Sequence, residues 1–218
     1  MKVYFISGLG GDERVFKNIK LPADCQAIHL PWIEPLPNES LKDYAIRLAA
    51  NIDVNERFAL VGLSLGGMIA TEISHHLSAE KVILISSIPL SAQMPTQYKL
   101  AAALRVHKFI PISFIKNLSK IKRLFSFENA DDKKMLMTMA SDTDPKFIRW
   151  AITAALSWRN NNLPQNLYHL HGTSDQVLPM RLTKPGYVIS KGGHLMVLNR
   201  AKEINKLMEE ILLEDSAS

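Results

Sequence analysis

The stretch from residue 60 to residue 70, LVGLSLGGMIA, places Ser64 between a predicted strand and a predicted helix. The apolar residues 58–61 predict a buried strand, and a helical pattern begins near Gly66. Gly62, Ser64 and Gly66 form the pattern Gly-x-Ser-x-Gly, which is typical of a serine on a sharp strand-to-helix turn. Such a turn gives the serine a positive φ, and the flanking glycines remove Cβ atoms that would collide. The hydroxyl is then exposed above a helix N-terminus, which favours negative charge.

The same pattern also fits an ordinary turn between a strand and a helix that merely contains a serine. The rest of the chain distinguishes the two interpretations. A nucleophilic serine needs a general base, an acid that orients this base and donors for an oxyanion.

The composition is that of a globular protein with one full core. The chain has 218 residues, of which 47% are hydrophobic and 22% charged. Its single cysteine, Cys25, cannot form an intramolecular disulfide, and the apolar start at 3–6 is too short for a signal peptide. No apolar run approaches the ~20 residues of a membrane span. We therefore expect a cytoplasmic protein without a stable membrane anchor.

The positive net charge of +5 does not indicate a nucleic-acid partner. Residues 91–150 contain eleven Lys or Arg and five Asp or Glu, so the surplus belongs to one segment, and no nucleic-acid-binding module is recognisable. The glycine-rich loop at 7–12 lacks the third glycine of a dinucleotide motif, because position 13 is Glu13. No Cys, His or carboxylate set has metal-ligand spacing. We expect neither a cofactor nor a metal, and the oligomeric state stays open.

Short apolar strands alternate with helices in the two outer parts of the chain. Strands are expected at 3–6, 26–30, 58–61, 81–86, 167–171 and 186–189, and helices at 41–52, 67–77 and 200–213. This alternation predicts an α/β protein with a mostly parallel sheet covered by helices on both faces.

The middle of the chain follows another pattern. Residues 89–163 show no strand-like run but four helical stretches, at 96–109, 112–125, 131–141 and 145–158. We predict one domain over residues 1–218, with a core formed by 1–88 and 164–218 and an inserted helical lid at 89–163. The substrate-binding residues are unknown and are expected within the lid.

Two further polar residues belong to the same edge of the predicted sheet as Ser64. Asp175 and His194 each come shortly after one of the last two strands. In a parallel sheet these strand ends lie together, and α/β proteins bind ligands there. The order Ser, Asp, His is the one expected after such a serine turn. The orienting acid could also come directly after the strand at 81–86, but residues 87–92 contain no carboxylate. This favours Asp175 as the acid.

With these residues the chain resembles the α/β-hydrolases, in the compact form that lacks N-terminal antiparallel strands. The resemblance covers residues 1–88 and 164–218. It implies that Ser64 is the nucleophile, His194 the general base and Asp175 the acid that orients His194.

The resemblance extends to the loop after the first strand. Ser7-Gly8-Leu9-Gly10 stands where many members have His-Gly-x-Gly, so a serine replaces the histidine and the backbone donor remains. The resemblance therefore implies an oxyanion hole formed by the backbone N–H groups of Leu9 and Leu65.

The other histidines fit the role of general base less well. His75 and His76 are expected on the helix after Ser64, roughly 16 Å along its axis. His169 and His171 alternate with apolar residues on a strand and are expected to be structural. His29 is a weak candidate for a pocket residue.

Two groups of lid residues allow more than one interpretation. Met135, Met137 and Met139 could line an acyl pocket, although packing between helices is the commoner role of such methionines. A basic helix could contact an anionic membrane surface or an acidic substrate, but a solvated face is favoured. Its charged residues are Lys116, Lys120, Lys122 and Arg123.

The sequence predicts a serine hydrolase that cleaves carboxylic esters through an acyl-enzyme on Ser64. Its partner would be a small-molecule ester or thioester. Thioester, C–C and amide hydrolysis, acyl transfer and cofactor-free haloperoxidation use the same three residues and stay open. A different alternative is a protein that binds a ligand with little turnover, because the fold does not determine the function.

Overall fold

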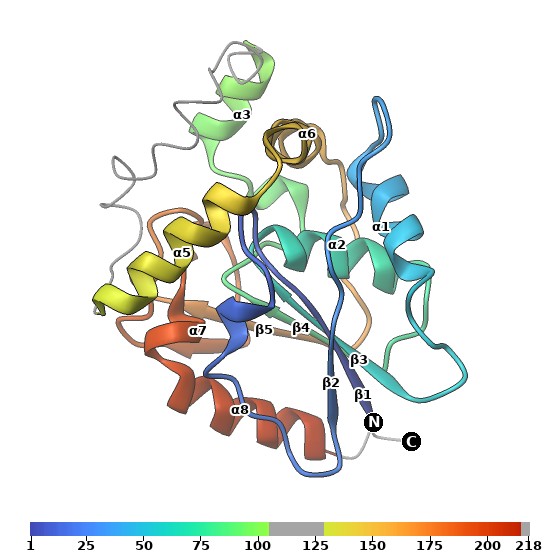
Figure 1. The fold of residues 1–218 in the computed structure, drawn as a ribbon, viewed down its shortest axis with the longest axis vertical. Coiled ribbons are helices and arrows are strands. Elements are labelled where there is room, and N and C mark those ends of the chain that lie inside the picture. The colour runs from blue at the N-terminus through green and yellow to red at the C-terminus, as the bar shows by residue number, and fades with distance from the viewer. Residues whose placement is uncertain (105–128, 215–218) are drawn as a thin grey trace.

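The computed structural model describes residues 1–104 and 129–214. Its centre is a sheet of six parallel strands in the order β2-β1-β3-β4-β5-β6 (Figure 1). In chain order the strands are β1 (Lys2–Ile6), β2 (Gln26–His29), β3 (Phe58–Leu63), β4 (Lys81–Ile85), β5 (Leu167–Gly172) and β6 (Tyr187–Ile189). The predicted parallel sheet is confirmed.

Strand β3 lies in the interior of the sheet, between β1 and β4. All six of its residues are buried, because both faces of a parallel sheet are covered. Gly62 pairs with Ile6 on one side, and Leu63 pairs with Ile85 on the other. Since all strands run the same way, the segments that follow them begin at one edge of the sheet, and Ser64 is among them.

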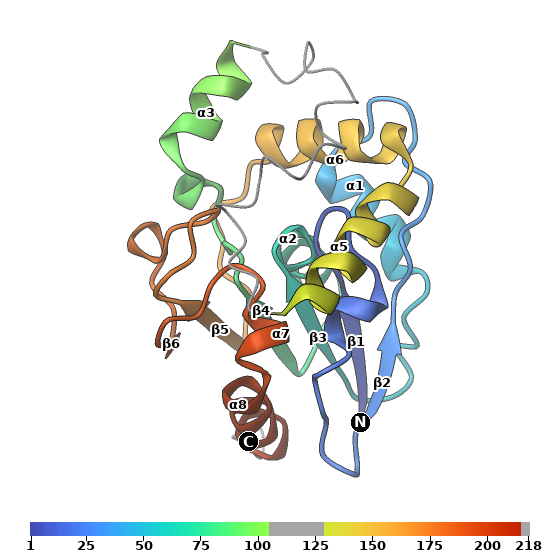
Figure 2. The ribbon, with the colours of Figure 1, turned by 60° about the vertical axis from the view of Figure 1, so that its left-hand side comes forward.

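Helices cover both faces of the sheet (Figures 1 and 2). One face carries α1 (Leu41–Ala49) and α2 (Leu65–Ser74), and the other carries α7 (Met196–Asn199) and α8 (Ala201–Leu213). Alternate residues of a strand point to opposite faces. Tyr4 and Ile6 accordingly join the apolar cluster with α1 and α2, whereas Val3 and Phe5 join the cluster with α8.

A third set of helices lies across the end of the sheet at which the strands finish (Figures 1 and 2). These helices are α3 (Thr96–Ala103), α5 (Ala130–Asp142) and α6 (Pro145–Ser157), and all come between β4 and β5 in the chain. They correspond to three of the four predicted stretches. The remaining stretch, 112–125, lies outside the described residues, as do residues 105–109 of the first stretch. The undescribed stretch contains Lys116, Lys120, Lys122 and Arg123.

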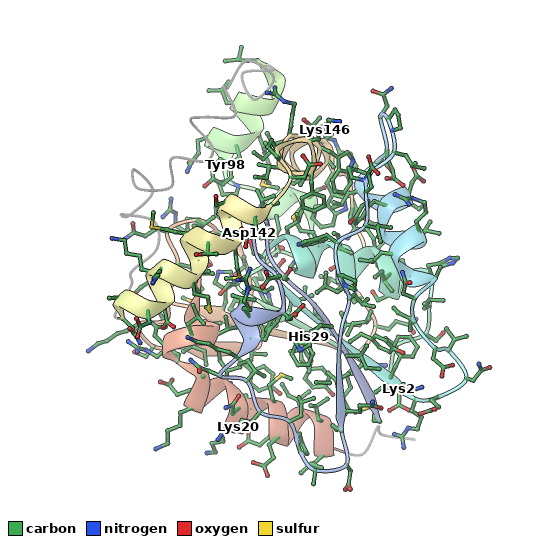
Figure 3. All side chains as sticks on the ribbon, viewed as in Figure 1. Lys2, Lys20, His29, Tyr98, Asp142 and Lys146 are labelled. Atoms are coloured by element: carbon green, nitrogen blue, oxygen red, sulfur yellow. The ribbon has the colours of Figure 1, made fainter. Side chains whose placement is uncertain are left out.

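Polar contacts with segments near the N-terminus link α5 and α6 to the rest of the chain. Asp142, at the end of α5, accepts a hydrogen bond from Arg14 Nη2 at 3.3 Å (Figure 3). The indole Nε1 of Trp150 on α6 donates to the carbonyl oxygen of Glu39 at 2.9 Å. Both helices thus contact residues distant in sequence. Within the described ranges, no helix combines the length and the apolar composition needed to cross a membrane.

Candidate active site

The turn between β3 and α2 has the strained geometry that its sequence predicts. Ser64 adopts φ 53° and ψ −117° and stands directly before the first residue of α2. A Cβ atom on Gly62 would overlap the carbonyl oxygen of Gly66. A Cβ atom on Gly66 would overlap the carbonyl oxygens of Ile6, the last residue of the neighbouring strand β1, and of Ser7, which follows it. The glycines are therefore required by close backbone contacts on both sides of the serine.

Ser64, His194 and Asp175 lie in one hydrogen-bonded line. Ser64 Oγ is 2.8 Å from His194 Nε2, and His194 Nδ1 is 2.8 Å from Asp175 Oδ2. A carboxylate can only accept, so Nδ1 carries the proton and Nε2 of the neutral ring accepts from the serine hydroxyl. The arrangement can remove a proton from Ser64 Oγ while this oxygen attacks an electrophile.

The carboxyl group of Asp175 is fully buried and has donors on both oxygens. Oδ1 accepts from the backbone N–H groups of Val177 and Leu178, each at 2.9 Å. Burial alone would raise the pKa of Asp175, but the hydrogen bonds from His171 and His194 and the backbone outweigh it. The pKa is therefore held well below its usual range, and Asp175 is an anion at neutral pH.

The loop after β1 passes directly beside the serine. A Cβ atom on Gly8 would lie 3.3 Å from Ser64 Cβ. Ser7 Oγ and Trp32 Nε1 both donate to the carbonyl oxygen of Gly11, at 2.8 and 2.9 Å, and this fixes the loop.

Two backbone donors next to Ser64 are free to bind a ligand. They are the N–H groups of Leu9, in this loop, and of Leu65, the first residue of α2. Within residues 1–104 and 129–214, neither has a hydrogen-bond acceptor. A free amide at a helix start and a second in an adjacent loop are the donors that an oxyanion requires.

The other histidines fall into two groups. His75 and His76 are exposed at the end of α2. His29, on the edge strand β2 (Figure 3), is exposed and also lines a small cavity of about 80 Å³ together with Ser7 and Trp32. His169 and His171 are buried on β5, and His171 Nε2 lies 3.3 Å from Asp175 Oδ2. The sequence interpretation treated the last two as structural and missed this contact. The only signal was their position just before Gly172 and the acid.

Residues 87–92, which contain no carboxylate, nevertheless contribute to the site. Ser87 follows β4 and donates a hydrogen bond from Oγ to the carbonyl oxygen of Ser64 at 2.6 Å. A Cβ atom on Gly67 would overlap this hydroxyl group. Ser87 therefore ties the serine turn to the neighbouring strand, a role that the sequence analysis did not assign.

A cavity of about 470 Å³ lies between α3, the end of α6 and the segment after β4. Met94 and Trp158 are on its apolar side, Lys99 and Arg159 are among its polar lining residues, and none of Ser64, Asp175 and His194 borders it. Met94, Tyr98 and Trp158 pack on the same apolar cluster as Leu65 and Leu178, which are next to the site. Apolar packing therefore continues from the residues next to the serine toward α3 and α6.

The methionines of α5 do not border this cavity. Met139 is buried, and Met135 packs with it against the cluster on the α8 face of the sheet. Met137 is 46% exposed. Met135 and Met139 therefore fit the packing role, and Met137 does not. Among the described residues, no group of three or more His, Cys, Asp or Glu side chains could hold a metal ion.

The sequence matches no protein-family model and no curated protein. Solved structures do match over nearly the whole chain. MenH from S. aureus is 18% identical, with a TM-score of 0.77, and the match covers 100% of this chain and 95% of that one. A lipase-esterase related protein from Clostridium acetobutylicum is 14% identical, with a TM-score of 0.71 and coverages of 96% and 93%. A carboxylesterase structure from Nitrososphaera gargenis is 17% identical, with a TM-score of 0.71 and coverages of 97% and 89%. At these identities the likeness concerns the fold alone.

Proposed function

We propose that this chain, which has the α/β-hydrolase fold, hydrolyses carboxylic esters through an acyl-enzyme on Ser64. The observation that carries the proposal is the line from Ser64 Oγ through His194 to Asp175, with 2.8 Å at each contact. The backbone N–H groups of Leu9 and Leu65, which have no acceptor among residues 1–104 and 129–214, support it further.

Acylation of the serine is the first half of the proposed reaction. Ser64 Oγ attacks the carbonyl carbon of the ester while His194 Nε2 takes the hydroxyl proton. The carbonyl oxygen becomes an oxyanion, which the N–H groups of Leu9 and Leu65 stabilise. When the tetrahedral intermediate collapses, the bond to the leaving oxygen breaks, and His194 gives its proton to the departing alcohol.

Deacylation repeats these steps with water as the nucleophile. His194 Nε2 removes a proton from water as the water oxygen attacks the acyl carbon. Collapse of the second intermediate breaks the bond to Ser64 Oγ, which regains its proton from His194, and the carboxylic acid leaves. Asp175 stays ionised throughout and stabilises the imidazolium that forms in both halves.

A fluorophosphonate probe tests the proposal without knowledge of the natural substrate. We expect it to label Ser64 and no other serine, as read by peptide mass spectrometry, and p-nitrophenyl esters to be hydrolysed with a burst when deacylation is slow. A folded protein that binds esters but leaves Ser64 unlabelled would instead favour the ligand-binding alternative.

The acyl group is expected to be apolar and of short to medium length. The apolar residues around the site support this: Tyr98, Met94 and Trp158 pack on the same cluster as Leu65 and Leu178. The proposal that residues 89–163 act as a lid supports it as well. A series of esters with one alcohol and increasing acyl length would measure the preference through kcat/KM. Equal or higher rates with monoesters of dicarboxylic acids would contradict it and would give Lys99 or Arg159 a binding role.

The backbone donor at Leu9 can be removed without changing the catalytic side chains. We expect Leu9→Pro to lower turnover roughly 10²–10³-fold, because proline has no N–H to offer the oxyanion. Leu9→Ala keeps the N–H and is the matched control, expected to act only through the shape of the pocket. A folded Leu9→Pro protein with undiminished turnover would show that the second donor lies elsewhere in the loop at 7–12.

A further inference from the structure

Two buried histidines on β5 connect the acid of the proposed triad to the backbone of the nucleophile. We propose that His171 is a positioning residue, whose Nε2–H group holds the Asp175 carboxylate, and that His169 fixes the tautomer of His171 that makes this possible. The inference rests on the proposed roles of Ser64, His194 and Asp175. It concerns two residues that the hydrolytic mechanism itself does not use.

The surroundings of His171 determine which ring nitrogen carries its proton. Nε2 lies 2.7 Å from the carbonyl oxygen of Leu178 and 3.3 Å from Asp175 Oδ2. The carbonyl oxygen of Leu178 can only accept. The same holds for the carboxylate oxygen, because Asp175 is ionised. His171 must therefore carry a proton on Nε2, and in the neutral ring Nδ1 is an acceptor.

His169 supplies the donor that this acceptor needs. Its Nε2 is 3.1 Å from His171 Nδ1 and 3.0 Å from the carbonyl oxygen of Ser87. A carbonyl cannot donate, so the proton of His169 is on Nε2 and is shared between these two acceptors. Burial is the main cause that lowers the pKa of His169 to about 4, so the ring is neutral at neutral pH.

One proton on each Nε2 satisfies every contact of the pair. If His171 were protonated, its Nδ1–H would face the N–H of His169, and two donors would oppose each other in a buried site. The carbonyl oxygen of Ser87 would lose its donor if His169 turned its proton away. The geometry therefore favours two neutral rings in a fixed pair of tautomers.

Ser87 completes the connection to the nucleophile. Its carbonyl oxygen accepts from His169, and its hydroxyl donates to the carbonyl oxygen of Ser64 at 2.6 Å. A chain of polar contacts thus runs from Asp175 Oδ2, which lies 3.3 Å from His171 Nε2, through the hydrogen-bonded pair of histidines and Ser87 to Ser64. It runs in parallel with the direct contact through His194 and keeps the acid and the nucleophile at a fixed separation.

The contact also affects how strongly Asp175 stabilises protonated His194. Asp175 Oδ2 receives His194 Nδ1 at 2.8 Å and lies 3.3 Å from His171 Nε2. Among the described residues, the titratable groups that face this carboxylate are His194, His171 and, from α3, Tyr98, whose pKa is raised by burial and by the charge of Asp175. A donor from His171 withdraws negative charge from Oδ2. Without it, Oδ2 carries more negative charge toward His194 Nδ1.

The inactivation of Ser64 by a fluorophosphonate, followed over pH, tests the positioning role. His171→Phe keeps a ring but removes the donor, so we expect inactivation to slow roughly 10–100-fold. The midpoint of the acid limb should rise by on the order of one pH unit. In His171→Gln the side-chain amide can donate from a similar position. This variant should therefore restore most of the native inactivation rate and most of the native acid-limb midpoint. The control is His76→Phe, at an exposed position just after α2. We expect it to be inactivated at the native rate and with the native acid-limb midpoint.

A structural role alone would give a different result. His171→Phe would then lose thermal stability while its acid-limb midpoint stayed native, and glutamine would rescue no better than phenylalanine. A folded His171→Phe protein with the native midpoint overturns the proposal.

The tautomers can be read in the native protein by ¹⁵N NMR of the imidazoles, with no requirement for a stable variant or for catalysis. We expect His169 and His171 both as neutral Nε2–H tautomers across the pH range in which inactivation of Ser64 rises. An Nδ1–H tautomer of His171, or its titration in that range, overturns the positioning role alone. Failure of the native protein to label at Ser64 overturns the proposed function and the positioning role together.

Discussion

Ser64→Ala and His194→Ala are each expected to lower ester turnover by up to ~10⁶-fold. Alanine at position 64 removes the atom that forms the acyl bond. Alanine at position 194 leaves Ser64 with a neutral hydroxyl group, which is a poor nucleophile without a base 2.8 Å away. Steady-state kcat with an activated ester measures both losses, with Ser78→Ala and His76→Ala as exposed controls.

The double variant separates a single catalytic unit from independent contributions. If Ser64 and His194 act together, removing both should be hardly worse than removing either one. Two losses that multiply would mean that the residues contribute to different steps. A folded Ser64→Ala protein that kept most of its esterase rate would reduce the Gly-x-Ser-x-Gly turn to an ordinary connection between β3 and α2.

The layout of the sheet could be predicted because its determinants are local in the sequence. Continuous apolar runs marked the strands, and the spacing of Gly62 and Gly66 marked the turn. The boundary of α2 was less certain, and the expected helix at 67–77 became Leu65–Ser74. Ser64 itself precedes the first helical residue, so the helix begins immediately after the strained serine.

The support of the acid could not be predicted, because it depends on contacts between distant segments. A Cβ atom on Gly172 would overlap the carbonyl group of Gly192, so the segments after β5 and β6 are pressed together. This contact places His194 next to Asp175. In the turn that follows Asp175, the N–H groups of Val177 and Leu178 both donate to its carboxylate. Strand alternation showed only that His171 and His169 share a face.

Asp175→Asn is expected to lower kcat on the order of 10⁴-fold. The structure determines how the new amide must turn. Its oxygen has to stay at the Oδ1 position, because the backbone N–H groups of Val177 and Leu178 both donate there. The NH₂ group then occupies the Oδ2 position and faces His194 Nδ1.

An amide NH₂ in that place reverses the hydrogen bond to His194. Nδ1 must accept, so the proton moves to Nε2, and the ring presents a donor to Ser64 Oγ instead of the lone pair that general-base catalysis needs. Single-turnover kinetics should show slow acylation, and ¹⁵N NMR should show the Nε2–H tautomer of His194. Asp24→Asn, at an exposed aspartate, should change neither. If Asp175→Asn folded, kept the native tautomer of His194 and acylated at the native rate, the orienting acid would have to be a residue other than Asp175.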